Sequence, residues 1–338
     1  MNNRLRLLFV LLAATLACNF PVYAPPILET PAALSPMNPM PGLSVETGTA
    51  VPPFEPVQTV VPSVGGKIVF TCQIFKVQAA NQICIVNADG SGLRRLTTDD
   101  NRQHFYPSLA PDGQSVLYAS FVEANVYDIY EMTFDGQVTR LTRDLGVAVA
   151  PEVSPDERLI AFTRWTPQTT YGIWVMNRDG SNPRQVFGPP YGSGWDPTWS
   201  PDGSRILFAS DMGGSVQLYT VDLDGKNLRK VTDMPALRGR SDWSPDGRSL
   251  VTYSGEPWHR EIYLLNADGS NVRQIGLPGG NSQGPSFSPD GAWVAFTSYF
   301  DHYGDKHGCE IYIMRVDGSD LRRLTDNDYC DYQPRWGP

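Results

Sequence analysis

The sequence predicts an all-β fold, a six-bladed β-propeller with four-stranded antiparallel blades. The first observation is a turn, Ser-Pro-Asp-Gly or a close variant, that recurs at a nearly constant interval, as expected when each blade contains one copy. Its aspartates, at Asp112, Asp156, Asp202, Asp246 and Asp290, lie 44, 46, 44 and 44 residues apart. The second observation is a set of six Asp-Gly turns, at Asp89, Asp135, Asp179, Asp224, Asp268 and Asp317.

Each repeat contains the strands that a blade requires. An apolar run follows each Pro-Asp turn, as at 205–209, and a second run leads into the Asp-Gly turn, as at 262–265. Both runs are short and rich in β-branched and aromatic residues, which is typical of buried strands. The last strand carries basic residues, as in Arg94 and Arg95, which suit an outer edge that must not pair with other chains. Because one such unit cannot bury both of its faces, we expect the copies to pack around an axis.

The two ends of the predicted propeller complement each other. The first repeat begins at 66–70 and lacks an innermost strand, whereas 333–338 match 196–201, the start of another blade. We therefore expect the propeller to span 65–338, with its C-terminal strand completing the first blade and closing the ring. One turn departs from the pattern, because Glu157 replaces the glycine. A left-handed conformation costs such a residue roughly 1–2 kcal/mol, so we expect this turn to relax to another type.

The N-terminal segment has the features of an export signal. Arg4 and Arg6 precede an apolar stretch at 7–17, too short for a membrane span of about 20 residues. The end of this stretch resembles a bacterial lipobox, which predicts a signal peptide at 1–18 and lipidation of Cys18; cleavage after Ala24 is the alternative. Residues 19–64 are rich in proline without a hydrophobic period, and we expect a disordered tether. These features predict a lipid-anchored protein on the periplasmic or extracellular face of a bacterial membrane.

Four cysteines lie within the predicted propeller. An even number in an exported chain indicates two disulfides. Cys309 and Cys330 fall on loops expected on the same face of the last blade, and Cys72 and Cys84 flank the corresponding hairpin of the first. We predict the pairs Cys72–Cys84 and Cys309–Cys330; the alternative is that all four remain free thiols.

The repeats resemble the WD40-like propeller repeats of the TolB family. Residues 285–291, Pro-Ser-Phe-Ser-Pro-Asp-Gly, and 266–271, Asn-Ala-Asp-Gly-Ser-Asn, are close copies of the family pattern, and the resemblance runs from about residue 66 to the C-terminus. TolB itself works with the Tol–Pal envelope system and carries an α/β domain before its propeller. A Pro-rich segment stands in that place here, so the resemblance implies the fold, and we expect a role apart from Tol–Pal. Similar repeats also occur in prolyl-peptidase propellers.

Motifs for catalysis are missing from the sequence. It contains neither a Gly-x-Ser-x-Gly elbow nor a glycine-rich phosphate loop, and the recurring Ser of Ser-Pro-Asp is a turn residue. Segments 177–182 and 266–271 resemble half of a calcium loop but lack its downstream glutamate. We expect no cofactor and no metal. Weak metal candidates are Asp301, His302, Asp305 and His307, in the longest loop of the last blade, where a solvated loop is the alternative.

The best candidates for binding lie where the repeats differ. The stretches around the start of each inner strand vary between copies and mix aromatic with charged residues, as binding sites do. We predict that they form the rim of the central channel, and ordinary loop chemistry is the alternative. The candidates are His104, Tyr106, Trp195, Asp196, Arg240, Asp242, Gln283 and Tyr332.

The net charge of the chain excludes some classes of binding partner. The net charge is −9 and the isoelectric point about 4.9, which argues against nucleic acid or an anionic membrane surface. We expect a non-catalytic binding or scaffold propeller of the bacterial cell envelope, monomeric and attached to the membrane only through its lipid. It would present its channel face and long loops to a protein, peptide or glycan. The alternative is a propeller enzyme, a lyase or hydrolase, with its site at the channel mouth.

Overall fold

The computed structural model describes residues 64–73, 81–299 and 308–338, which belong to one compact unit, Ser63–Pro338. Every regular element in these ranges is a β-strand, so the predicted all-β class is confirmed. The predicted lipidation site Cys18, the tether at 19–64 except its last residue, and the loop candidates Asp301, His302, Asp305 and His307 lie outside the described residues.

Four separate sheets contain four antiparallel strands each. The first consists of β24 (Asp331–Gly337), β1 (Lys67–Gln73), β2 (Asn81–Asn87) and β3 (Arg94–Arg95). The second consists of β12 (Gly194–Trp199), β13 (Arg205–Ser210), β14 (Gln217–Asp222) and β15 (Arg229–Lys230). The third consists of β16 (Asp242–Trp243), β17 (Ser249–Ser254), β18 (Glu261–Asn266) and β19 (Arg273–Gln274). The fourth consists of β20 (Gln283–Phe287), β21 (Trp293–Ser298), β22 (Glu310–Arg315) and β23 (Arg322–Arg323).

The remaining strands form one eight-stranded sheet with two halves. One half is β4 (His104–Leu109), β5 (Ser115–Glu123), β6 (Val126–Thr133) and β7 (Val138–Arg140). The other half is β8 (Val147–Val153), β9 (Leu159–Thr166), β10 (Thr169–Asn177) and β11 (Arg184–Phe187). Each half is an antiparallel four-stranded meander, and the halves meet at a single parallel residue pair, Tyr127 with Val147.

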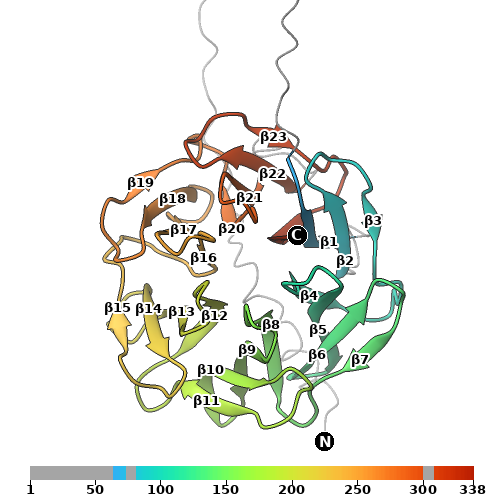
Figure 1. Cartoon of the computed structure of the whole chain (residues 1–338), viewed down its shortest axis with the longest axis vertical. Helices are drawn as coiled ribbons and strands as arrows, with labels where there is room; N and C mark the ends of the chain where they lie inside the picture. The colour runs from blue at the N-terminus through green and yellow to red at the C-terminus, as the bar shows by residue number, and fades with distance from the viewer. Residues whose placement is uncertain (1–63, 74–80, 300–307) are drawn as a thin grey trace, which may run out of the picture. The chain divides into compact units, whose positions relative to one another are not determined.

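The sheets are arranged around a central axis, with β4, β8, β12, β16, β20 and β24 innermost and the short strands with basic residues outermost (Figure 1). The predicted closure is confirmed, because β24 pairs antiparallel with β1 and brings Trp336 opposite Ile68. Trp336 also donates a hydrogen bond from Nε1 to the carbonyl of Gly65, at 3.1 Å. The two ends of the described chain thus share one sheet.

The hydrophobic core lies between neighbouring sheets. One cluster joins Ile68 and Phe70 of β1 to Ile311 and Ile313 of β22, which belongs to a different sheet. Four of the second strands carry a fully buried phenylalanine at the same position: Phe70, Phe162, Phe208 and Phe296. Equivalent strands therefore bury equivalent side chains, as packing of copies face to face requires.

The repeated turns adopt the conformation that their sequence predicts. Gly113, Gly203, Gly247 and Gly291 have φ between 67° and 71°, in the left-handed region. The expectation for Glu157 was wrong: it keeps φ at 60°, and its N–H donates to the Ser154 carbonyl at 2.8 Å, as glycine does in the other copies. The flanking strands β8 and β9 hold this turn in the common geometry, because the residues on both sides of it are paired.

Both predicted disulfides are present. Cys72 of β1 is bonded to Cys84 of β2, and Cys309 is bonded to Cys330. The second bond links the residue that precedes β22 to the residue that precedes β24, so it ties the closing strand to the neighbouring sheet.

Candidate functional site

The innermost strands share an interruption in their pairing. In five of them the residue before a proline has a left-handed backbone, namely Tyr106, Ala150, Asp196, Gly284 and Gln333, with φ of 53°, 51°, 52°, 62° and 58°. The pairing register shifts at the same points in all five. Such bulges bend a strand and redirect its side chains. Two predicted rim residues, Tyr106 and Asp196, occupy this bulge position, and Arg240 is its counterpart before β16.

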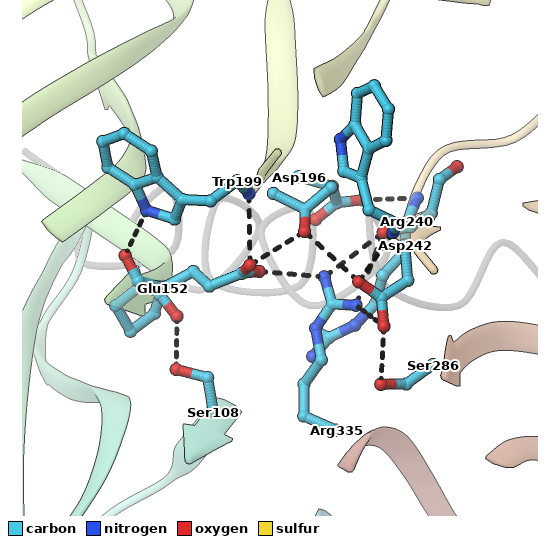
Figure 2. A network of polar contacts seen from close by, with 12 residues as sticks. Ser108, Glu152, Asp196, Trp199, Arg240, Asp242, Ser286 and Arg335 are labelled. Carbon is cyan, nitrogen blue, oxygen red and sulfur yellow. Dashed lines mark hydrogen bonds and ion pairs between the residues drawn. The ribbon is translucent and has the colours of Figure 1, made fainter. Parts of the chain in front are cut away.

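Two residues further along, each innermost strand contributes to a network at the axis. The six equivalent residues are Ser108, Glu152, Thr198, Asp242, Ser286 and Arg335. Thr198 Oγ1 donates to Glu152 Oε1 at 2.8 Å, and Ser286 Oγ donates to Asp242 Oδ2 at 2.9 Å. These hydrogen bonds cross between sheets, so the axis is filled by a continuous polar network (Figure 2).

Arg335 is the centre of this network. Its Nη2 lies 3.3 Å from Glu152 Oε2 and its Nη1 lies 3.5 Å from Asp242 Oδ2. Both nitrogens also approach the Ser241 carbonyl, at 3.4 Å. The residue is only 7% exposed, so its charge depends on these partners for compensation. Burial raises the pKa of Glu152, against the opposing effect of the Arg335 charge.

Arg240, beside this network, has a different environment. It is 6% exposed, and its Nη2 donates to the Pro107 carbonyl at 3.3 Å. Its Nε is buried without a hydrogen-bond partner, and the guanidinium forms no ion pair with a carboxylate of the described residues. Burial, reinforced by the charge of Arg335, lowers the pKa of Arg240 to about 10, so it remains a cation at neutral pH.

Aromatic and acidic side chains surround Arg240. Its guanidinium carbon lies 5.8 Å from the centroid of the Tyr106 ring. Asp196 Oδ2 accepts a hydrogen bond from the backbone N–H of Arg240 at 3.2 Å. Burial raises the pKa of Tyr106, and raises that of Tyr253 to about 12, so both phenols are neutral. The pKa of Tyr106 is also raised by the charges of Asp196, Tyr253 and Tyr171.

A small pocket opens between the network and Arg240. Its volume is about 10 Å³, which is room for about one water molecule. It is lined by Ala150, Pro151, Glu152, Asp196, Pro197, Arg240 and Arg335. The lining therefore consists of one alanine and two prolines from the bulges and of four ionisable side chains. All seven residues belong to innermost strands or to the segment that precedes β16.

The predicted rim residues fall into two groups. Tyr106, Asp196, Arg240 and Asp242 meet around the pocket or in the network that adjoins it. The others are His104, Trp195, Gln283 and Tyr332, and they do not line the pocket.

These other residues have contacts of their own. His104 is buried with its ring edge-on to Tyr118, at 5.3 Å, and burial lowers its pKa to about 4. Gln283 Oε1 accepts from Arg260 Nη1 at 2.6 Å, and Tyr332 donates from its hydroxyl to Asn81 Oδ1 at 2.8 Å. Trp195 packs against an apolar cluster of the second four-stranded sheet and its neighbour.

The sequence interpretation missed Glu152 and Arg335. They stand at the variable position of the repeated Pro-x-Trp-Ser-Pro pattern, as does Asp242 in the copy that begins at Arg240. Charged residues at this position in three copies were the available signal, because the position otherwise holds serine or threonine.

No metal centre is formed by the described residues, which contain no group of three or more His, Cys, Asp or Glu side chains suited to one. The turn aspartates that resemble calcium ligands act within their turns instead: Asp179 and Asp268 accept the backbone N–H of Ser181 and Ser270, each at 2.9 Å. Within the same ranges, no helix has the length and apolar character needed to cross a membrane.

Comparison with curated proteins gives relatives of partial length. An uncharacterized protein of Agrobacterium fabrum is 32% identical over 170 residues, covering 47% of this chain and 56% of that protein. A TolB homolog of Chlorobium luteolum is 32% identical over 124 residues, covering 36% of this chain and 27% of the homolog. The chain thus spans little more than half of the first relative and about a quarter of the second.

Solved structures share the fold at low identity. TolB from Acinetobacter baumannii superposes with a TM-score of 0.70 at 22% identity, covering 81% of this chain and 67% of TolB. Hydrazine synthase from Kuenenia stuttgartiensis gives 0.64 at 16% identity, covering 80% of this chain and 46% of the synthase. Proteins with such different names carry this fold, so these likenesses establish the fold alone.

The family is established by a sequence model that covers most of the chain. The model of the TolB beta propeller domain matches residues 59–252 and 229–338. These ranges contain every described strand, both disulfides and the whole axial network. The chain therefore belongs to the TolB beta propeller domain family.

Proposed function

We propose that this protein is a non-catalytic binding or scaffold propeller of the bacterial cell envelope. Its channel face and neighbouring loops would present a surface to a protein, peptide or glycan. One observation carries the proposal: the bulge position of the innermost strands differs in every copy, whereas the turns and the core repeat. The six residues at that position are Tyr106, Ala150, Asp196, Arg240, Gly284 and Gln333. Function in repeat folds is usually placed where copies diverge on a regular scaffold.

The scaffold that we propose has six blades. The two halves of the eight-stranded sheet count as separate blades, because a single residue pair joins them. Six four-stranded blades agree with the six Asp-Gly turns of the sequence. Because β24 pairs with β1, the first blade also has an innermost strand and the ring is closed. A closed ring would keep the channel face rigid.

We further propose that the protein is exported and anchored by lipid at Cys18. Two disulfides support an oxidising compartment, where such bonds form and persist. Replacing Cys18 with alanine should release the protein from the membrane fraction into the soluble fraction of an osmotic-shock extract. The variant should also lose incorporation of a clickable fatty acid. Equal labelling and fractionation of the wild type and Cys18→Ala would count against the anchor.

The binding role can be tested by capturing partners from the envelope. Tagged full-length protein is cross-linked in bacteria and purified beside two variants, Asp196→Asn at the pocket and Asp233→Asn on the outside. Asparagine tolerates the left-handed backbone of Asp196. Asp233 is the control, because its side chain is 93% exposed and, among the described residues, its ion pair is with Lys230 on the outside. We expect a partner whose yield falls at least tenfold with Asp196→Asn and is unchanged with Asp233→Asn. Equal yields from all three proteins would contradict binding at the channel face.

The non-catalytic part of the proposal has a separate test. The purified protein should turn over none of a panel of peptide, ester and oligosaccharide substrates. The variants Glu152→Gln and Asp242→Asn serve as probes, because these carboxylates lie at or beside the pocket. Turnover by the wild type that either variant abolishes would favour a propeller enzyme instead.

A further inference from the structure

We propose that four aromatic residues on two extended hairpins, β5–β6 and β9–β10, form a platform that binds a neutral glycan. These residues, the aromatic row, are Phe121, Tyr127, Trp165 and Tyr171. The proposal rests on the binding function above and adds the surface and the class of ligand.

The middle strands in the two halves of the eight-stranded sheet are longer than those of the other sheets. β5 and β10 contain nine residues and β6 and β9 eight, whereas the middle strands elsewhere contain six or seven. Because β5, β9 and β13 begin at the same distance from their turn aspartates, the extra residues lie at the hairpin ends. They are 121–123, 126–127, 165–166 and 169–171, which include the whole aromatic row. Functional residues are often placed on such additions to a regular scaffold.

The extended hairpin ends lie on the face of the propeller where the innermost strands begin. The first residue of β4 stands opposite Ser120, directly before the extra residues of β5. The first residue of β8, Val147, pairs with Tyr127 on one side and with Trp165 on the other. Strands β5, β6, β8, β9 and β10 lie side by side (Figure 1). The aromatic row therefore crosses the junction of the two halves, on the face that carries the channel mouth.

The four aromatic side chains form one surface. Residues that stand opposite each other on paired strands project from the same face of a sheet. Phe121 stands opposite Tyr127, with ring centroids 5.3 Å apart, and the rings of Trp165 and Tyr171 stack at 6.1 Å. All four are half-buried, so each ring packs against its neighbour and keeps part of its surface in solvent. Five strands spaced about 4.8 Å apart give the row a length of roughly 19 Å, that of a short oligosaccharide.

The aromatic row combines ring faces with unused polar groups. Within the described chain, the hydroxyls of Tyr127 and Tyr171 and the Nε1–H of Trp165 have no hydrogen-bond partner. Burial raises the pKa of both phenols, so they are neutral donors at physiological pH. A sugar has the matching chemistry, because its C–H face packs on an aromatic ring while its hydroxyls exchange hydrogen bonds with the polar tips. Purely apolar side chains of a partner would bury these donors unpaired, at a cost in free energy.

The exposed surface around the row is almost uncharged. The exposed residues at the hairpin tips are 122–125 and 167–170, and Glu123 is the one charged residue among them. Arg164, at the base of the second hairpin, is engaged within the protein, where its Nε donates to the Leu145 carbonyl at 2.8 Å. An anionic ligand would meet Glu123 and a protein of net charge −9, and a cationic one a single exposed carboxylate. A neutral ligand needs no opposite charge when it leaves water, so the charges favour a neutral glycan.

The test is isothermal titration calorimetry of the full-length protein with four neutral tetrasaccharides, namely cellotetraose, maltotetraose, mannotetraose and chitotetraose. We expect at least one to bind saturably, with the same affinity at 50 and 500 mM NaCl, because no ion pair is involved. Tetragalacturonate is the charged control and should not bind at tenfold higher concentration. Equal affinity for tetragalacturonate, or binding of none of the four neutral sugars, would overturn the proposal. Capped tetraproline is the uncharged peptide probe, since aromatic grooves recognise proline-rich segments, and its binding without that of any tetrasaccharide would overturn the glycan assignment.

Matched variants identify the surface responsible. Trp165→Ala should weaken binding of the tetrasaccharide at least tenfold, and Trp165→Phe, which keeps a ring face, should give a smaller loss. Tyr127→Phe and Tyr171→Phe remove only a hydroxyl without a partner in the described chain, so they should fold normally and bind severalfold more weakly. Trp258→Ala is the control, because Trp258 is a half-buried tryptophan on the β17–β18 hairpin of another sheet. Unchanged affinity in the three positions of the row, or an equal loss in Trp258→Ala, would contradict the assignment.

The envelope capture separates this inference from the proposed function. If Asp196→Asn loses its partner while no tetrasaccharide binds, the channel face binds a partner and the glycan assignment is wrong. If a tetrasaccharide binds through Trp165 while the capture yields are equal, the aromatic row binds a glycan and binding of a partner at Asp196 is wrong. If neither a sugar nor a partner binds, both fail.

Discussion

At the scale of single residues, the two axial arginines should have opposite effects on stability. Replacing Arg335 with methionine leaves the largely buried carboxylates of Glu152 and Asp242 without a cation. Breaking a buried pair in this way costs about 3–5 kcal/mol. Arg240→Met removes a buried charge that has no carboxylate partner, so stability should be unchanged or higher. Thermal unfolding followed by circular dichroism measures both. Equal destabilisation by the two substitutions would show that Arg240 is a structural residue.

A buried acid, Asp331, should make stability depend on pH. Burial, followed by the charge of nearby Glu310, raises the pKa of Asp331 to about 8. The unfolded value is about 4, so between pH 4 and 8 the native state holds a proton that the unfolded state has lost. Stability should therefore fall as pH rises through this window and level off above pH 8. Asp331→Asn keeps the acceptor for Asn327 Nδ2 and should flatten the fall. Urea unfolding from pH 4 to 9 measures it; identical slopes in both proteins would exclude Asp331 as the cause.

At the scale of elements, the turn at Glu157 isolates the cost of one left-handed residue. The surrounding strands impose φ of 60° on Glu157. The other four Pro-Asp turns have glycine at this position. Glu157→Gly should stabilise the protein by about 1 kcal/mol, the left-handed penalty less the greater entropy of unfolded glycine. Urea unfolding of the variant gives the difference. Gly203→Glu in the matching turn should have the opposite sign, and a loss of stability in Glu157→Gly would contradict this account.

The elements also show why the fold was predictable and the site only partly so. The strands and turns could be predicted from short stretches of sequence, namely apolar runs and turns such as 200–203, and these patterns recur in each copy. Closure could be predicted because the C-terminal residues match the start of another copy. The candidate residues Tyr106, Asp196 and Arg240 were found because the copies differ there. Glu152 and Arg335 were missed because their pairing joins strands far apart in the sequence, β8 and β24. The sequence around a charged residue does not indicate which other charged residue it pairs with on a different strand of the ring.

At the scale of the whole molecule, closure places the last strand at the centre of the structure. β24 pairs with β1, contributes Arg335 to the axial network, and buries Trp336 against β1 and β21. The disulfide Cys309–Cys330 anchors the residue just before it. One strand thus contributes to the pairing of the first sheet, to the core and to the candidate site. Its loss should therefore disrupt all three.

Removing β24 should therefore abolish cooperative folding. The effect should exceed the small decrease in the free energy of unfolding expected from the loss of a few contacts. A chain that stops at Cys330 keeps both disulfides but leaves β1 without its inner neighbour and Glu152 and Asp242 without Arg335. We expect a broad thermal transition in place of a single sharp one, and recovery when a peptide of residues 331–338 is added. Trp336→Ala in the full chain isolates the packing part and should cost about 3–5 kcal/mol, whereas Trp336→Phe should cost less. A truncated chain that unfolds as sharply, and at the same temperature, as the full chain would mean that the ring is held by its other sheets and that β24 serves the site alone.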